Sequence, residues 1–127
     1  MTVEVHIKSE YAVLLSHRIV HSVEMVKYIV NHLNGYLRVR CVLTNDDFLE
    51  VALHLCSQAG QVVTDSYRYQ WMDSTHTTLR RRWDNAPHYP DLQGFPHHCH
   101  VEHEDNVESA SLMDITHLLN FITDNIT

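Results

Sequence analysis

Apolar and polar residues alternate most clearly in the middle of the chain. Residues 36–44 read YLRVRCVLT, and residues 62–72 place three aromatic side chains on one face and Arg68 and Gln70 on the other. Strict alternation of this kind is typical of strands with one buried face. Short segments rich in Asn, Asp and Gly separate the runs, and such connections are too short for a crossover helix. The pattern therefore predicts an antiparallel meander with strands at 36–44, 48–56, 62–72 and 77–84.

The N-terminal third is ambiguous between helix and strand. Val23, Val26, Val30 and Leu33 recur at helical spacing, but this stretch is rich in β-branched residues, which lose rotamer freedom in a helix. We therefore favour a helix near residues 9–17, followed by a strand over 19–30.

At the other end, the periodicity disappears between residues 85 and 109, where three prolines prevent a regular helix. Ser111 and Asp114 have the spacing of a capping box, which predicts a helix start. A helical stripe follows at Leu112, Ile115, Leu119 and Ile122. We expect one α+β domain over 1–127, with an N-terminal and a C-terminal helix on a meander of about five strands. Trp71, Trp83 and Phe95 are expected in its core.

The composition is dominated by histidine. The chain has 12 histidines against 9 lysines and arginines, and its formal charge is −7 with histidine neutral. Because histidine titrates near physiological pH, the net charge is unusually sensitive to pH. The negative charge argues against a strongly basic protein that coats nucleic acid. Three separated cysteines without a CxxC pair, and the lack of a secretion signal or long apolar run, predict a cytoplasmic protein with reduced thiols.

The densest candidate chemistry lies at residues 80–100, which read RRRWDNAPHYPDLQGFPHHCH. One interpretation is a metal site. His98 and His100 are two residues apart and therefore point to the same side of an extended segment, while His97 points away. His88 or Asp84 completes the site in this interpretation, and the ligand types suit zinc.

A second interpretation is metal-free cleavage of RNA. His98 and His100 are then the acid and base candidates, with His88 as a further catalytic candidate. Arg82 serves as the phosphate clamp and Asp84 as its orienter, because a guanidinium grips two phosphate oxygens at once. The expected substrate-binding residues are Arg68, Tyr69, Arg80, Asn85 and His97, with Tyr67 as an alternative platform for stacking a base.

A third interpretation gives these residues no catalytic role. Asp84 then pairs with an arginine, His97 bonds a backbone carbonyl, and the protein binds a partner through its histidine-rich loop or an exposed edge of the meander. Taken singly each residue fits such a structural role, whereas the density of histidine and arginine in one segment favours function. We interpret the more scattered histidines as structural or surface residues: His6, His17, His32, His54, His76, His103 and His117. The position of His21 is left open.

Four segments of the sequence resemble the TumE-like toxin family: GYLRVR at 35–40, YRYQWMD at 67–73, RWDNAPHYPDL at 82–92 and FPHHCHV at 95–101. The similarity extends over about residues 19–123. It implies a compact α+β toxin that acts as an endoribonuclease, and a partner, a helix-turn-helix antitoxin encoded beside it. The positions that match the family pattern are Tyr69, Arg82, Asp84, Asn85, His88, Pro96, His97, His98 and His100.

The chain departs from that pattern at two places. Leu53 and His54 stand near the end of the third strand, where family members often have an acidic residue, and the turn at Asp46 and Asp47 lacks the usual glycine. The hypothesis with the most support is a toxin with metal-independent endoribonuclease activity and no cofactor. The alternative is a non-catalytic metal-binding or protein-interaction module, with zinc held by His98, His100 and His88. A homodimer is compatible with either.

Overall fold

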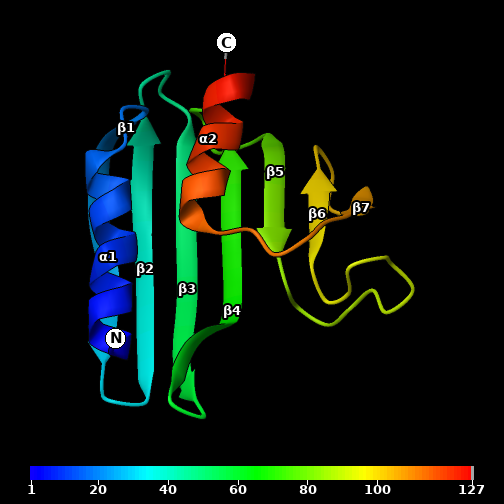
Figure 1. The fold of residues 1–127 in the computed structure, drawn as a ribbon. Coiled ribbons are helices and arrows are strands. Elements are labelled where there is room, and N and C mark those ends of the chain that lie inside the picture. The colour runs from blue at the N-terminus through cyan, green and yellow to red at the C-terminus, as the bar shows by residue number, and fades with distance from the viewer. Residues whose placement is uncertain (127) are drawn as a thin grey trace.

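A computed structural model describes residues 1–126 and shows two helices packed on one antiparallel sheet (Figure 1). In chain order the elements of this part of the chain are α1 (Val3–Ser16), β1 (Val20–Val30), β2 (Asn34–Leu43), β3 (Phe48–Gln58), β4 (Gln61–Met72), β5 (Leu79–Asp84), β6 (His98–Val101), β7 (Val107–Ser109) and α2 (Ile115–Asn125). The α+β prediction is confirmed.

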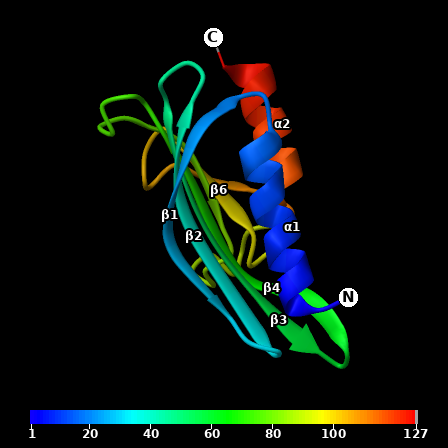
Figure 2. The same ribbon diagram turned by 90° about the vertical axis from the view of Figure 1, so that its left-hand side faces the viewer.

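The sheet is a simple meander, in which each strand pairs antiparallel with the next along the chain. Both helices lie on the same side of the sheet, α1 near the β1 end and α2 across the middle (Figures 1 and 2). Apolar side chains alternate toward that side. On β3, for example, Leu49, Val51 and Leu53 are buried in the core with the helices. We call the opposite side of the sheet, which no helix covers, the open face.

Seven strands replace the five expected, because β6 and β7 lie inside the segment that we predicted to be irregular. These strands have four and three residues, too few to show a period. Moreover, His98, Cys99 and His100 are all buried. A strand covered on both faces carries no apolar–polar alternation, so the periodicity could not reveal it.

The helix and strand predicted in the N-terminal third are both present, but α1 begins at Val3 rather than near residue 9. The Thr2 hydroxyl accepts the Val5 N–H at 3.1 Å and caps the helix. Val3, Ile7 and Leu14 form its buried side. Gly35 on β2 permits the close approach, since a Cβ there would lie 2.8 Å from Val3 Cγ1.

Helix α2 confirms the predicted C-terminal helix but not its capping box. The N-cap is Asp114 itself, whose carboxylate accepts the His117 N–H at 2.7 Å. Leu112 therefore lies before the helix and is 56% exposed, while Leu118 takes the fourth buried position beside Ile115, Leu119 and Ile122. The prediction that Leu112 begins the apolar stripe was therefore wrong. Acidic residues are favoured both at the N-cap and in the first turn of a helix, so the sequence did not show which of these positions Asp114 takes.

Trp71 and Trp83 lie in the core as expected, whereas Phe95 is 44% exposed and does not. Phe95 belongs to the connection between β5 and β6, which runs beside the sheet rather than under the helices (Figure 1). The predicted turn at residues 45–47 is present, and Asp46 adopts a φ of 72° there. An aspartate tolerates this left-handed conformation and so replaces the missing glycine. Within residues 1–126 no helix has the length and apolarity needed to cross a bilayer.

Candidate active site on the open face of the sheet

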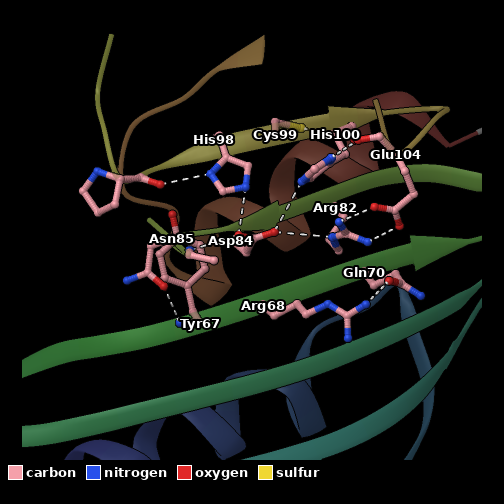
Figure 3. A network of polar contacts seen from close by, with 12 residues as sticks. Tyr67, Arg68, Gln70, Arg82, Asp84, Asn85, His98, Cys99, His100 and Glu104 are labelled. Atoms are coloured by element: carbon pink, nitrogen blue, oxygen red, sulfur yellow. Dashed lines mark hydrogen bonds and ion pairs between the residues drawn. The ribbon is translucent and has the colours of Figure 1, made fainter. Parts of the chain in front are cut away.

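Strand register gathers the predicted site residues into two adjacent rows on the open face. Arg68 pairs with Asp84, and Asp84 pairs with His98. In the next row of the same face, Gln70 pairs with Arg82 and Arg82 with His100. Residues that are far apart in the sequence thus become neighbours across β4, β5 and β6 (Figure 3).

The Asp84 carboxylate is the centre of the cluster. Its Oδ1 lies 2.9 Å from His98 Nε2, and its Oδ2 lies 3.6 Å from His100 Nε2. All three residues are buried. One potential ligand atom from each lies within 4.8 Å of the others. We call Asp84, His98 and His100 the triad.

Backbone carbonyls fix how both imidazole rings are turned. His98 Nδ1 lies 3.0 Å from the carbonyl oxygen of Pro96, and His100 Nδ1 lies 2.6 Å from that of Glu104. A carbonyl oxygen only accepts hydrogen bonds, so each Nδ1 carries the proton. In the neutral rings the lone pairs are therefore on the two Nε2 atoms, which face Asp84. His98 Nε2 is buried without a hydrogen-bond partner among the described residues.

Arg82 is held by carboxylates on two sides. Its Nε lies 3.4 Å from Asp84 Oδ2, and both terminal nitrogens donate to Glu104. The hydrogen bond to Glu104 raises the pKa of Arg82, and the same bond lowers the pKa of Glu104. The expected phosphate clamp is thus already occupied by an exposed carboxylate, which a phosphate group has to displace.

The connection between β5 and β6 covers one side of the triad. Asn85 anchors its start, because the side-chain amide accepts the Tyr67 N–H and donates to the Asp65 carbonyl. Further along, the Tyr89 ring packs edge-on against His98 and His100, with ring centroids 4.8 and 5.9 Å away. The loop therefore shields the triad from that side.

Beside the triad the open face is hollowed into a cavity of about 740 Å³. Arg68 and His88 line it, together with the rings of Tyr36 and Tyr89. The Arg68 guanidinium bonds only Gln70 among the described residues, at 2.7 Å. Arg68 is consequently the cation of the cavity that is most available to an anionic ligand.

Three of the expected substrate-binding residues do not line this cavity. Tyr69 is 1% exposed and packs in the core, so its ring does not face this cavity. Arg80 lies at an irregularity in the β4–β5 register and pairs instead with buried Asp47, at 2.6 Å. His97 points away from the triad, as predicted, and its Nδ1 bonds the Tyr67 hydroxyl at 2.9 Å. Burial lowers the pKa of His97.

Sequence reasoning missed several contributors to the site: Tyr36, Tyr89, Asp65, Glu104 and the Pro96 carbonyl. Of these, Tyr36, Tyr89 and Pro96 lie within the motifs singled out above, whereas Asp65 and Glu104 do not. Asp65 is relevant to the departure from the family pattern noted above, in which an acidic residue is missing near the end of the third strand. His54 occupies that region, and its Nδ1 lies 2.9 Å from Asp65 Oδ2. A carboxylate is therefore present here on the neighbouring strand.

Comparison with family models shows to which protein family the chain belongs. The family model described as Toxin TumE matches residues 10–126. The chain belongs to the TumE toxin family. This match contains every element from β1 to α2 and the second half of α1, so both the sheet and the triad fall within the TumE region. No curated protein and no solved structure matches the chain.

Proposed function

We propose that this TumE-family toxin is an endoribonuclease whose substrate lies in the cavity of the open face. The observation that carries the proposal is the triad itself. A buried carboxylate faces two imidazole nitrogens whose tautomers are fixed, at the wall of a cavity that also presents Arg68. Preorganised groups of this kind, next to a site able to bind an anion, are what phosphodiester cleavage requires.

The proposed reaction uses the RNA strand's own 2′-hydroxyl as the nucleophile. Its oxygen bonds to phosphorus while the bond from phosphorus to the 5′-oxygen breaks. The 2′-hydroxyl proton passes to the triad, which acts as the base. The departing 5′-oxygen takes up one proton in return, so that no proton is gained or lost overall. The products are a 2′,3′-cyclic phosphate and a 5′-hydroxyl, and no net water is consumed. We assign the base function to the triad as a unit.

Around the triad, the other cavity residues bind the substrate. Arg68 contacts the phosphate, since Arg82 is engaged by Glu104. Tyr36 and Tyr89 provide ring faces on which a base can stack, the role first expected of Tyr69. His88 and Asn85 line the same cavity, His88 as an exposed group and Asn85 as an anchor of the wall.

Incubation of the purified chain with a labelled single-stranded RNA tests this proposal. We expect fragments that end in 2′,3′-cyclic phosphates. Arg68→Ala should weaken RNA binding about tenfold, in line with the loss of one charge-assisted contact. The matched control is Arg18→Ala, because Arg18 is exposed and lies outside the cavity. Intact RNA with the parent chain, or equal losses in both variants, would contradict the proposal.

We also propose that the toxin works with an antitoxin and in the cytoplasm. Membership of a toxin family supports the partner, and three free cysteines fit a reducing compartment. A helix-turn-helix gene beside this one, whose product restores growth when both are expressed, is the expected finding. Failure of that neighbouring product to restore growth would count against the pairing.

A further inference from the structure

We propose that Asp84, His98 and His100 bind one divalent transition-metal cation of the zinc type. This inference deepens the proposed nuclease function, on which its catalytic use rests, but the binding itself stands on the geometry of the triad. The sequence left open whether His88 or Asp84 completes the site with the two histidines, and the geometry selects Asp84. His88 is exposed and is not one of the three grouped residues.

The donor atoms are spaced for a shared ion. Around a tetrahedral zinc with bonds of about 2.0–2.1 Å, neighbouring ligand atoms lie roughly 3.3 Å apart. The two distances from Asp84 oxygens to the imidazole nitrogens, 2.9 and 3.6 Å, fall on either side of that value. Two histidines and one carboxylate also form a set found in catalytic zinc sites, where the fourth position stays open for water or substrate.

In the neutral form of the two rings, the Nε2 atoms and the Asp84 carboxylate share no proton, and a cation would join them. With Nδ1 protonated toward the carbonyls of Pro96 and Glu104, each neutral ring turns its Nε2 lone pair toward a carboxylate, which also bears lone pairs. His98 Nε2 is fully enclosed and has no hydrogen-bond partner in the part of the chain described. A cation between the three groups satisfies all of them. Metal-binding histidines commonly donate their second N–H to a carbonyl in this way.

The charges around the triad permit Asp84 to bind a cation, although its oxygens also accept from Ala86 N–H and Arg82 Nε. The nearest competitor is Arg82, which is matched by a two-fold hydrogen bond to Glu104. The cavity as a whole has two arginines against three carboxylates, Asp65, Asp84 and Glu104. With neutral histidines its formal charge is therefore −1, and a bound divalent ion changes it to +1. A positive cavity explains how a chain of net charge −7 attracts a phosphodiester.

Metal binding is tested on the full chain without RNA. The chain is stripped with a chelator, dialysed, and titrated with CoCl₂ and then ZnCl₂. We expect one Co²⁺ per chain with visible ligand-field absorption, which Zn²⁺ abolishes by displacement. His98→Ala, His100→Ala and Asp84→Asn should each lose this absorption. His103→Ala should retain it, since His103 is exposed and lies outside the triad.

A second readout does not depend on the folding of variants. In long-range ¹H–¹⁵N spectra of the parent chain, Zn²⁺ should shift the Nε2 signals of His98 and His100 and leave those of the exposed histidines in place. Absence of stoichiometric Co²⁺, absorption that His98→Ala and His100→Ala both retain, or a proton on His98 Nε2 that Zn²⁺ does not remove would each overturn the inference.

The two proposals fail in different ways. Co²⁺ bound by the triad in a chain that leaves RNA intact would refute the nuclease and support the metal site. Undiminished RNA cleavage by a chain shown to be metal-free, in the presence of chelator, would refute a catalytic use of the metal and support cleavage by the histidines alone, while the Co²⁺ titration decides the binding itself.

Discussion

Asp84 organises the site more than any other residue. Its carboxylate accepts the Ala86 N–H at 3.0 Å and also faces His98, His100 and Arg82. A single short side chain thereby connects the end of β5, strand β6 and the start of the connecting loop. Because its side chain is buried, each of these contacts forms in an environment where electrostatic interactions are strong.

Glu104 limits access to the second arginine of the cavity, and Glu104→Gln tests this. The substitution removes the charge that occupies the Arg82 fork, while the backbone carbonyl that holds His100 is unchanged. RNA affinity should rise about fivefold to tenfold, corresponding to about 1–1.4 kcal/mol for one newly available ionic contact. Fluorescence anisotropy with a labelled single-stranded RNA measures it. Asp105→Asn removes an equal charge next to this position and should have a smaller effect. Equal affinities of Glu104→Gln and the parent chain would contradict this role.

Asp47 is a buried carboxylate that joins β4 and β5 outside the site. Its carboxylate accepts the Trp71 indole N–H at 2.9 Å and pairs with Arg80. Asp47→Ala leaves the buried indole N–H without a partner, so we expect the free energy of unfolding to fall by about 2 kcal/mol. Urea denaturation monitored by tryptophan fluorescence measures the change. Asp91→Ala, in an exposed loop, should stay within about 0.5 kcal/mol of the parent chain. Similar losses in both would contradict the assignment.

Among the residues of the site, the sequence identified Arg82, Asp84, His98 and His100 because they fall in one short segment. It identified Arg68 separately, from its place on a predicted alternating strand. It did not identify Glu104 or the carbonyls of Pro96 and Glu104. A backbone carbonyl has no residue-type signal, and an exposed glutamate beyond the motifs resembles any other surface charge. The alternation of β4 placed Tyr69 on one face with Tyr67 and Trp71, but its ring was expected to bind substrate because aromatic rings can stack on bases.

At the scale of elements, β6 is the strand that makes the site possible. It sends Cys99 to the core and His98 and His100 to the open face, and all three are buried. Strands β2 and β4 were predicted from their alternation, and β3 from a mostly apolar run between two turns. β6 and β7 were not, because short strands between loops acquire their structure from pairing with a neighbour rather than from local pattern.

Helix α2 offers a test of its own at the element scale. Asp114→Ala removes the cap that accepts the His117 N–H and should lower the free energy of unfolding by about 1 kcal/mol. Asp124→Ala, a matched change in the last turn, should be neutral or slightly stabilising, because a carboxylate there opposes the helix dipole. Thermal unfolding followed by circular dichroism compares the two. A larger loss for Asp124→Ala would contradict the cap assignment.

At the scale of the whole molecule, the histidine excess divides into two groups. Most histidines lie outside the site, while His88, His98 and His100 line one cavity and His97 supports its wall. The overall charge of −7 therefore says little about the ligand. What matters is the local balance on the open face, where two arginines, three histidines and three carboxylates, Asp84 among them, line one cavity. Anion binding there depends on Arg68 and, in our proposal, on a cation held by the triad.

The central claim is that the triad is responsible for toxicity, and growth on induced expression tests it most directly. The chain with His98→Ala and His100→Ala should permit growth, while the parent chain and His103→Ala should arrest it, at equal soluble levels and with native circular dichroism. Growth arrest by the folded double variant, as strong as that by the parent chain, would contradict the account.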